Sequence, residues 1–277
     1  MKTGLVLEGG AMRGLFSAGV IDVMMEHGVE VDGIIGVSAG AAFGCNYKSR
    51  QAGRAIRYNM RFCKDKRYAG LHSLITTGDL FNAEFAYHVV PTEYDVFDGK
   101  TFEENKTEFV VVCTDIEKGL PVYHRIDRFD YDALEWIRAS ASMPMASNVV
   151  ELEGMKLLDG GVTDSIPLRE SERRGYKRNI VILTQPEGYR KEKLKLMPLA
   201  KLWLHRYPEL VKAMAERHIM YNNQLDYVAE REKEGTAIVV RPDEKLPIGH
   251  TSHNADEMHR VYMIGRRKGE ELCKLKL

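Results

Sequence analysis

Ser38 occupies the centre of a G-x-S-x-G motif, with Gly36 and Gly40 two positions to either side. The apolar residues Val31, Ile34, Ile35 and Val37 run into the motif as in a strand, and a segment rich in small residues, 39–44, leaves it as in a helix. A serine on a sharp strand-to-helix turn has a strained backbone, and only small residues at those two positions leave room for the bend. The motif therefore predicts a nucleophilic serine suited to acyl transfer.

A glycine-rich loop at residues 8–14 (E-G-G-A-M-R-G) supplies a second element of such chemistry. It lies between a predicted buried strand, residues 4–7, and a predicted helix, residues 15–25, whose apolar side chains gather on one face. Backbone N–H groups at a helix N-terminus face an anion favourably. In acyl transfer this anion is the tetrahedral oxygen, and loss of one donor costs ~10²–10³ in kcat.

A serine hydroxyl also needs a base to take its proton. None of the histidines stands in a motif with an orienting carboxylate; they are His27, His72, His88, His124, His205, His218, His250, His253 and His259. Asp159 is the stronger candidate, because it follows a short apolar strand, residues 156–158, and precedes Gly160 and Gly161. Two glycines leave little to obstruct the approach of a strand-end carboxylate to Ser38.

Together the motifs G-G-x-x-R-G, G-x-S-x-G and D-G-G resemble those of patatin-like phospholipases. Residues 138–144 and 159–167 resemble the family's segments before and around the aspartate, and residues 76–81 and 115–119 resemble a bacterial subgroup. The likeness covers roughly the first 185 residues. It implies a lipid acyl hydrolase that uses a Ser-Asp dyad without histidine and requires no metal or organic cofactor.

Carried over residue by residue, the resemblance makes Ser38 the nucleophile and Asp159 the base that activates first the serine and later water. It assigns Gly9, Gly10 and Ala11 to the oxyanion hole, and Arg13 and Gly14 to support of that loop. Two positions depart from the family pattern, since Glu8 replaces a common aspartate and Ala11 a common third glycine. Alanine keeps the backbone donor, provided that the residue needs no positive φ.

The composition narrows the class of protein further. The 277 residues include 40 basic and 40 acidic side chains, so nothing in the bulk charge indicates nucleic acid. Every apolar run ends well short of the ~18 residues of a membrane span, so we expect the protein to contact a bilayer only at its surface. The first strand begins at once, which leaves no room for a signal peptide. Scattered cysteines predict reduced, buried thiols in a cytoplasmic protein.

The alternation of strands and helices predicts an α/β fold with a mostly parallel sheet between helical layers, the three-layer patatin-like architecture. We expect a single domain over residues 1–277, more helical from about residue 190. The further strands expected are residues 109–114, 122–125, 156–158, 179–184 and 237–240, and the clearest further helices are residues 131–139 and 254–274. Residues 191–234 have a mostly helical pattern, interrupted by Pro198 and Pro208.

Three features admit other uses. The leucines of residues 191–207 suit a lid or an interfacial helix, but packing against the sheet is the favoured interpretation. His250, His253 and His259 resemble a metal cluster but lack suitable partners, which favours a solvated loop. Asp164 could cap the segment that follows it.

The favoured function is cleavage of a lipid or other acyl ester, with peripheral membrane contact as a further expectation. One alternative is an α/β-hydrolase whose base is His250, His253 or His259. Another is a nucleotide-binding module, although the loop lacks the Lys-Ser/Thr or ordered G-x-G-x-x-G pattern of such sites. The last alternative is a scaffold protein that retains the fold but has no catalytic turnover.

Overall fold

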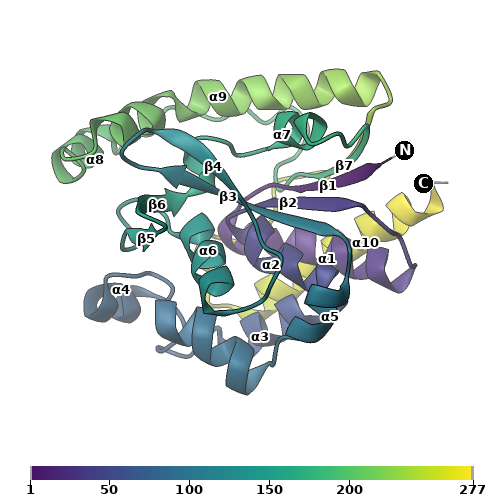
Figure 1. Ribbon diagram of the computed structural model, residues 1–277, viewed down its shortest axis with the longest axis horizontal. Coiled ribbons are helices and arrows are strands. Elements are labelled where there is room, and N and C mark those ends of the chain that lie inside the picture. Colours follow the sequence, from purple (N-terminus) through teal and green to yellow (C-terminus); the bar gives the residue numbers. More distant parts are fainter. Residues whose placement is uncertain (1, 276–277) are drawn as a thin grey trace.

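The computed structural model describes residues 2–275, which form a sheet of eight strands between two helical layers (Figure 1). The strands are β1 (Thr3–Leu7), β2 (Gly33–Val37), β3 (Glu108–Asp115), β4 (Leu120–Arg125), β5 (Val150–Leu152), β6 (Met155–Asp159), β7 (Arg178–Ile182) and β8 (Ala237–Val240). Their order is β5-β6-β3-β2-β1-β7-β8, with β4 also paired to β3. The run from β3 to β8 is parallel, whereas β4, β5 and β6 pair antiparallel. The predicted α/β class is thereby confirmed.

Helices cover both faces of this sheet (Figure 1). One layer contains α1 (Gly14–Glu26), α2 (Ala39–Lys48), α3 (Arg54–Phe62), α5 (Gly99–Glu104), α6 (Tyr131–Ala141) and α10 (Ala255–Lys274). The other contains α7 (Leu168–Arg173) and α9 (Pro208–Lys233), with α8 (Met197–Trp203) beside α9. The short helix α4 (Leu71–Thr77), the π-helix η2 (Glu84–Tyr94) and the 3-10 turns η1 (Ala11–Arg13) and η3 (Gly160–Val162) complete the set.

Alternation along the strands divides the core between the two layers. Leu5 and Leu7 join the large apolar cluster beneath α1 and α10. Val6 points the other way and packs with Tyr221 and Val228 of α9. Successive side chains of a strand point to opposite faces, so a sheet covered on both sides needs continuous apolar strands such as β1.

Helix α1 is buried all round, so the expectation of a single apolar face is wrong. Every residue from 14 to 24 is buried, because α10 covers the side that the sheet leaves open. The two helices meet at glycines: a Cβ at Gly265 would overlap the carbonyl oxygen of Phe16, and one at Gly19 would overlap that of Tyr262. Their backbones are therefore in direct contact.

The segment from residue 191 differs from its expected form. Residues 191–196 form no helix, and Pro198 and Pro208 begin α8 and α9 rather than interrupt one. Proline suits a first turn, where its missing N–H needs no partner. Most of the leucines do not pack against the sheet as expected, since Leu194, Leu196, Leu199 and Leu202 are exposed. Met197, Ala200 and Leu204 pack in an apolar cluster with Leu158 of β6 and Leu210 of α9, whereas Leu202 and Trp203 are 69% and 61% exposed.

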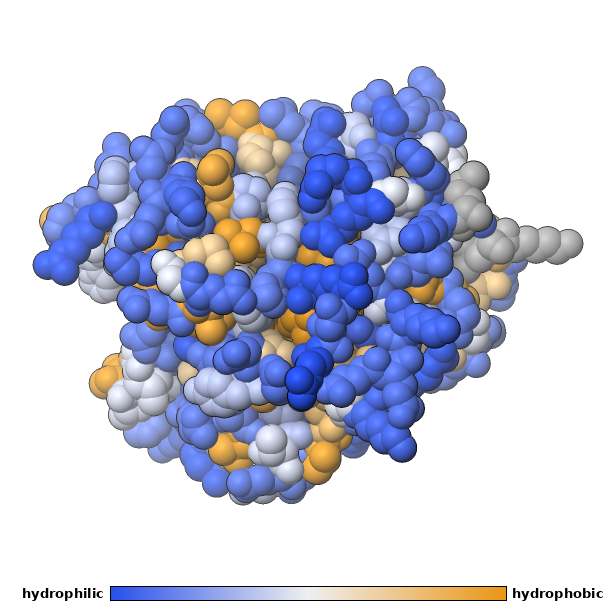
Figure 2. All heavy atoms as spheres, viewed as in Figure 1, coloured by the Kyte–Doolittle hydropathy of each residue, from blue (hydrophilic) through white to orange (hydrophobic). Residues whose placement is uncertain are grey.

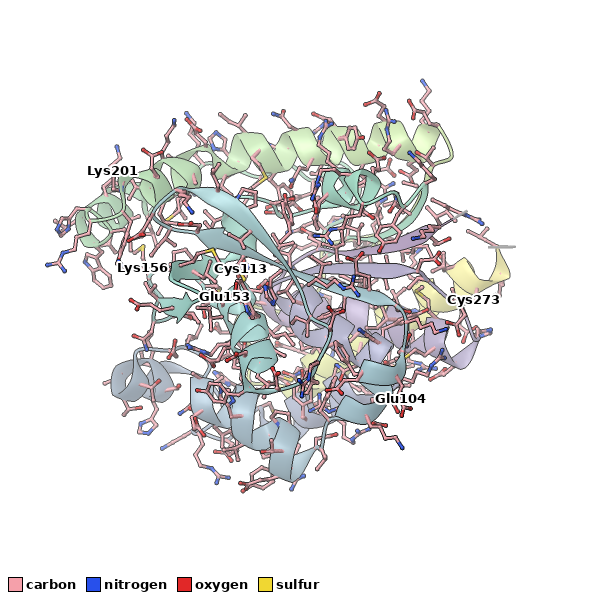
Figure 3. The ribbon with its side chains drawn as sticks, in the orientation of Figure 1. Glu104, Cys113, Glu153, Lys156, Lys201 and Cys273 are labelled. Carbon is pink, nitrogen blue, oxygen red and sulfur yellow. The ribbon has the colours of Figure 1, made fainter. Side chains whose placement is uncertain are left out.

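The cysteines largely follow expectation, with one exception. Cys45, Cys63 and Cys113 are free and buried, but Cys273 near the end of α10 is only half-buried. Figure 3 shows Cys113 within the sheet and Lys201 projecting outward from α8. The view in Figure 2 shows a mostly hydrophilic face with apolar residues in small, separate patches.

We predict that Gly265→Ala destabilises the protein by about 2–3 kcal/mol, because the new methyl forces α10 away from α1. The measurement is the urea midpoint of unfolding, followed by circular dichroism. Gly249→Ala is the matched control, since a Cβ there meets no atom within 4 Å, and its midpoint should change little. Equal midpoints for the two variants would contradict the close helix contact.

Candidate active site

Strand β3 aligns the ends of two other strands. Along its first half β2 runs parallel, and the register pairs Val37 with Val112. Along its last residues β6 runs antiparallel, and Asp159 pairs with Cys113, the next residue of β3. The ends of β2 and β6 therefore point toward each other, which places Ser38 beside Asp159.

Ser38 has the strained backbone that its motif predicts, with φ 55° and ψ −121°. A Cβ at Gly36 would lie 2.6 Å from the carbonyl oxygen of Gly40. A Cβ at Gly40 would overlap the carbonyl oxygen of Leu7. The Ser38 amide donates to the Ser140 hydroxyl at 2.9 Å, and that hydroxyl donates to the Val112 carbonyl at 2.7 Å. Ser140 thus ties the turn to β3.

Asp159 is a buried carboxylate held by its surroundings. The Gly161 amide donates to its side chain at 2.7 Å, while the Thr114 hydroxyl donates to its carbonyl at 2.8 Å. Burial raises the pKa of Asp159, and the positive charge of Arg217 and a hydrogen bond with the Ser38 side chain lower it in part. A raised pKa makes this carboxylate a better proton acceptor than an exposed aspartate.

The glycine-rich loop lies against the serine. A Cβ at Gly9 would be 2.9 Å from the Ser38 Cβ, so only glycine fits there. Among the residues that the structure describes, no backbone acceptor meets the amides of Gly9 and Gly10. Ala11 has φ 48°, so the proviso that it needs no positive φ is not met. A left-handed alanine costs roughly 1–2 kcal/mol, yet its amide stays in the loop.

The predicted support residues divide between packing and the cavity. Gly14 lies against α2, where a Cβ would be 2.6 Å from that of Ala39. The Arg13 guanidinium contacts the ring of His250 at 2.9 Å and lines the space outside Ser38. Gly160 lies directly over the carbonyl of Val112. The amide of Gly161 donates the hydrogen bond that the Asp159 side chain accepts.

Glu8 links the loop to elements far along the chain. Its buried carboxylate accepts from the Thr184 amide and from the Tyr221 hydroxyl, each at 2.5 Å. Burial raises the pKa of Glu8, and these two hydrogen bonds lower it in part. The glutamate noted as a departure from the family pattern thus joins β1 to the end of β7 and to α9. No local signal in the sequence indicates Tyr221 or Arg217, since both lie about 200 residues from the loop.

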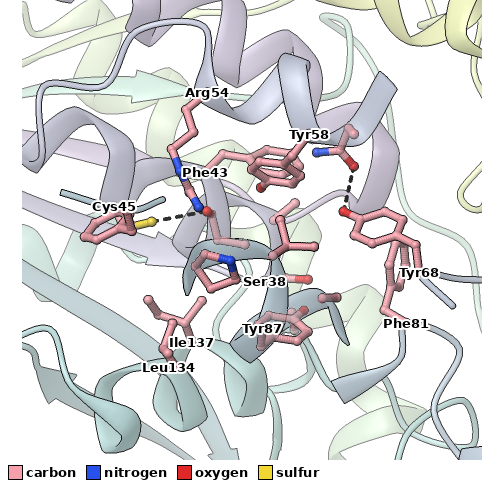
Figure 4. A pocket seen from close by; sticks show the side chains of 18 of the residues that line it. Ser38, Phe43, Cys45, Arg54, Tyr58, Tyr68, Phe81, Tyr87, Leu134 and Ile137 are labelled. Atoms are coloured by element: carbon pink, nitrogen blue, oxygen red, sulfur yellow. Dashed lines mark hydrogen bonds between the residues drawn. The ribbon is translucent and has the colours of Figure 1, made fainter. Parts of the chain in front are cut away.

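Two cavities share Ser38, Ala11 and Met143. The inner one is narrow and mostly apolar, and about 100 Å³ of it is wide enough for water. Figure 4 shows the aromatic rings around it, from Phe43, Tyr58, Tyr68, Phe81 and Tyr87. The outer cavity has a volume of about 840 Å³ and also contains Asp159, Arg13, Lys191 and Arg217. The serine therefore stands where an apolar space meets a polar one.

Other predicted candidates lie elsewhere. Asp164 accepts from Tyr123 and Gln224 and lines neither cavity, and burial raises its pKa to about 6. His253 bonds to the Cys63 carbonyl, and His250 contacts Arg13 rather than Ser38. Within residues 2–275, no group of three or more histidine, cysteine or acidic side chains could hold a metal ion.

Comparison with known proteins identifies relatives for most of the chain. A model of patatin-like phospholipases matches residues 5–171, and a model described only as a domain of unknown function matches residues 207–274. Uncharacterized protein YjjU of Escherichia coli is 32% identical over 67% of this chain and 52% of that protein. Lysophospholipase nte1 of Aspergillus terreus is 33% identical over 60% of this chain but only 11% of that protein. The chain thus spans about half or less of these relatives.

A solved structure, VipD from Legionella pneumophila, aligns with 99% of this chain and 67% of its own at a TM-score of 0.46 and 14% identity. In the described part of the chain, every helix is too short or too polar to traverse a bilayer.

We predict that Ser140→Ala destabilises the protein by about 1–3 kcal/mol, because the buried Ser38 amide and Val112 carbonyl each lose a partner. Urea unfolding measures the change. Ser147→Ala serves as control, since no hydrogen bond of the Ser147 hydroxyl is found among the described residues. A Ser140→Ala variant as stable as this control would argue against the tie between the turn and β3.

Proposed function

Since the chain belongs to the family of patatin-like phospholipases, we propose that it is a serine hydrolase that cleaves carboxylic esters of lipids, with Ser38 as nucleophile and Asp159 as base. The observation that carries the proposal is the position of Ser38, next to a buried carboxylate and between an apolar and a polar cavity. The name lysophospholipase, borne by relatives about a third identical to this chain, supports a lipid ester as substrate.

In the first half of the reaction, the Ser38 oxygen attacks the ester carbonyl carbon while Asp159 takes the hydroxyl proton. The carbonyl oxygen becomes negative and accepts hydrogen bonds from the amides of Gly9, Gly10 and Ala11. As the intermediate collapses, the bond to the alcohol breaks and Asp159 returns its proton to the departing alkoxide. An acyl group remains on Ser38.

In the second half, Asp159 removes a proton from water, and the resulting hydroxide attacks the acyl carbon. The same amides hold the second oxyanion. Collapse frees the fatty acid, and the Ser38 oxygen recovers its proton from Asp159. A single carboxylate thus serves both halves, which requires it to be ionised before each attack.

The two cavities suggest how the substrate lies. The inner cavity offers aromatic and aliphatic walls from α2, α3, η2 and α6, which suit an acyl chain. The outer cavity is wider and carries charge, which suits the alcohol portion and water. An ester across Ser38 would place its carbonyl at the residues common to both spaces.

The alternatives have less support. A histidine triad would need an imidazole at Ser38, but His250 bonds to Arg13, and burial together with that charge lowers the pKa of His250. A nucleotide-binding loop would carry a Lys-Ser/Thr or an ordered G-x-G-x-x-G, and residues 9–14 have neither.

We expect Ser38→Ala and Asp159→Asn each to lower ester hydrolysis by at least about 10³-fold, because each removes one half of the activated nucleophile. Release of fatty acid from monoacylglycerol and lysophospholipid measures the rates. His253→Ala and His259→Ala are controls, with rates expected to stay near wild type. A fluorophosphonate should label wild type and not Ser38→Ala. Full activity in either dyad variant would reject the mechanism, and absence of labelling in wild type would indicate a scaffold without turnover.

We also propose that α8 and the loop before it touch a membrane surface. Leu194 and Leu196 line the outer cavity and are exposed, and Leu202 and Trp203 are exposed on α8. Lysines 193, 195 and 201 lie among them. Apolar side chains flanked by lysines suit an interface with anionic lipid.

We predict that vesicles of phosphatidylglycerol shift the tryptophan emission to shorter wavelength, because Trp203 leaves water whereas the buried Trp136 does not change its surroundings. Trp203→Phe should abolish the shift. Co-sedimentation provides a second measurement, in which Leu202→Asp weakens binding and Met263→Asp, on α10 across the sheet, does not. Equal binding by both aspartate variants would exclude α8 as the contact.

A further inference from the structure

Three cationic side chains meet in the outer cavity without a neutralising partner. Arg13, Lys191 and Arg217 come from η1, from the loop before α8 and from α9, and all line the same space beside Ser38. Among residues 2–275, no carboxylate lies within ion-pair distance of any of them, whereas Arg190 at the rim contacts Asp226 at 2.5 Å. A cluster of this kind is poised for an anion that is not part of the chain.

The burial of these groups strengthens the argument. The Nε atoms of Arg13 and Arg217 are buried and have no hydrogen-bond partner among the described residues. A buried donor without a partner costs roughly 1–3 kcal/mol, and more when it is charged. Burial and the charges of Arg217 and Arg13 also lower the pKa of Lys191 to about 8, which reports mutual repulsion within the cluster.

The acids nearest the cluster are already engaged. Glu8 accepts from Thr184 and Tyr221, and Asp159 accepts from Gly161 and faces Ser38. Neither carboxylate forms an ion pair with the lysine or the arginines, although the charge of Arg217 lowers the pKa of Asp159 and that of Arg13 lowers the pKa of Glu8. Glu192 also lines the cavity, yet positive charge still prevails, because six lysine and arginine side chains face it against three acidic ones.

Asn222 holds the backbone of Lys191 in place, and the Tyr221 ring lies beside the ammonium of this lysine. Its amide donates to the Asn222 side chain at 2.8 Å, and its carbonyl accepts from the same side chain at 3.1 Å. Its ammonium lies 5.1 Å from the centre of the Tyr221 ring. Arg217 lies next to Gly161, the residue whose amide donates to Asp159. Its Nη2 would be 3.0 Å from a Cβ at Gly161.

From this placement we propose that Lys191 and Arg217, with Arg13 beside them, bind a phosphate group carried on the alcohol side of the ester. Guanidinium and ammonium groups donate charge-assisted hydrogen bonds to phosphate oxygens. The inference rests on the proposed function, because it requires an ester at Ser38 whose alcohol portion lies in the outer cavity. The substrate class is then a glycerophosphate ester of a fatty acid, preferred over the neutral glyceride.

The test compares lysophosphatidylglycerol with monoacylglycerol of the same acyl chain, through the ratio of their kcat/KM values. Wild type should favour the phosphate ester. Lys191→Met should lower the ratio by about tenfold or more, because it removes one charge-assisted hydrogen bond to the phosphate. Lys191→Arg should restore much of the ratio. Lys212→Met, an exposed lysine of α9 outside the cavity, is the matched control. A ratio that is the same in Lys191→Met and Lys212→Met overturns the proposal.

The pH profile adds a readout that a merely structural lysine would not move. Lys191 faces Arg217 and Tyr221 of α9, Glu8 and Arg13 of the loop, Asp159 of β6 and the ring of His250. Deprotonation of Lys191 above pH about 8 removes its charge, so the wild-type ratio should fall there and the Lys191→Arg ratio should not. A ratio independent of pH in wild type counts against the lysine.

A binding measurement separates this proposal from the proposed function. Titration of Ser38→Ala with glycerol 3-phosphate or inorganic phosphate requires no turnover, and Lys191→Met in that background should weaken binding about tenfold. Glycerol 3-phosphate binding better than inorganic phosphate indicates a headgroup site, and the reverse a free-anion site, which overturns the substrate assignment. If neither ester is cleaved yet binding depends on Lys191, the hydrolase proposal fails alone. Failure of both anions to bind rejects the phosphate subsite even where esters are cleaved.

Discussion

The pairing of β3 with two partners of opposite direction is the constraint on which the site depends. Val112 lies beside the end of β2 and Cys113 beside the end of β6, so one peptide unit of β3 fixes the separation of the serine and the carboxylate. The parallel strand gives way to an antiparallel one at this point of the sheet. The site thus owes its geometry to the register of backbone hydrogen bonds along β3.

Electrostatics around this point follow from burial. Asp159 and Glu8 are both buried carboxylates with raised pKa values, and both are held by hydrogen bonds from backbone amides. Arg217 opposes the effect of burial at Asp159 by favouring its ionised form. The pKa of Asp159 thus reflects two opposing influences. Burial raises the pKa of its carboxyl group, and the positive charge of Arg217 favours the ionised form.

The sequence predicts well what is decided locally. Gly36 and Gly40 indicate the turn at Ser38, because the bend excludes a Cβ at both positions. Strand and helix types follow from periodicity, as β1, β3 and α10 illustrate. What stays out of reach depends on which surfaces meet. Periodicity could not show that α10 covers the second face of α1, or that Leu202 and Trp203 point outward, because an all-apolar pattern fits several orientations. Arg217 and Tyr221 enter the site only through tertiary packing of α9.

The glycine contact between α1 and α10 bears on how the matched regions depend on each other. One family model covers residues 5–171 and another residues 207–274, yet Gly19 and Gly265 bring helices from the two into backbone contact. A shortened chain lacking the second region would leave one side of α1 bare, directly behind the glycine-rich loop. The C-terminal helix is therefore an integral wall of the core, and the two matched regions share one hydrophobic cluster.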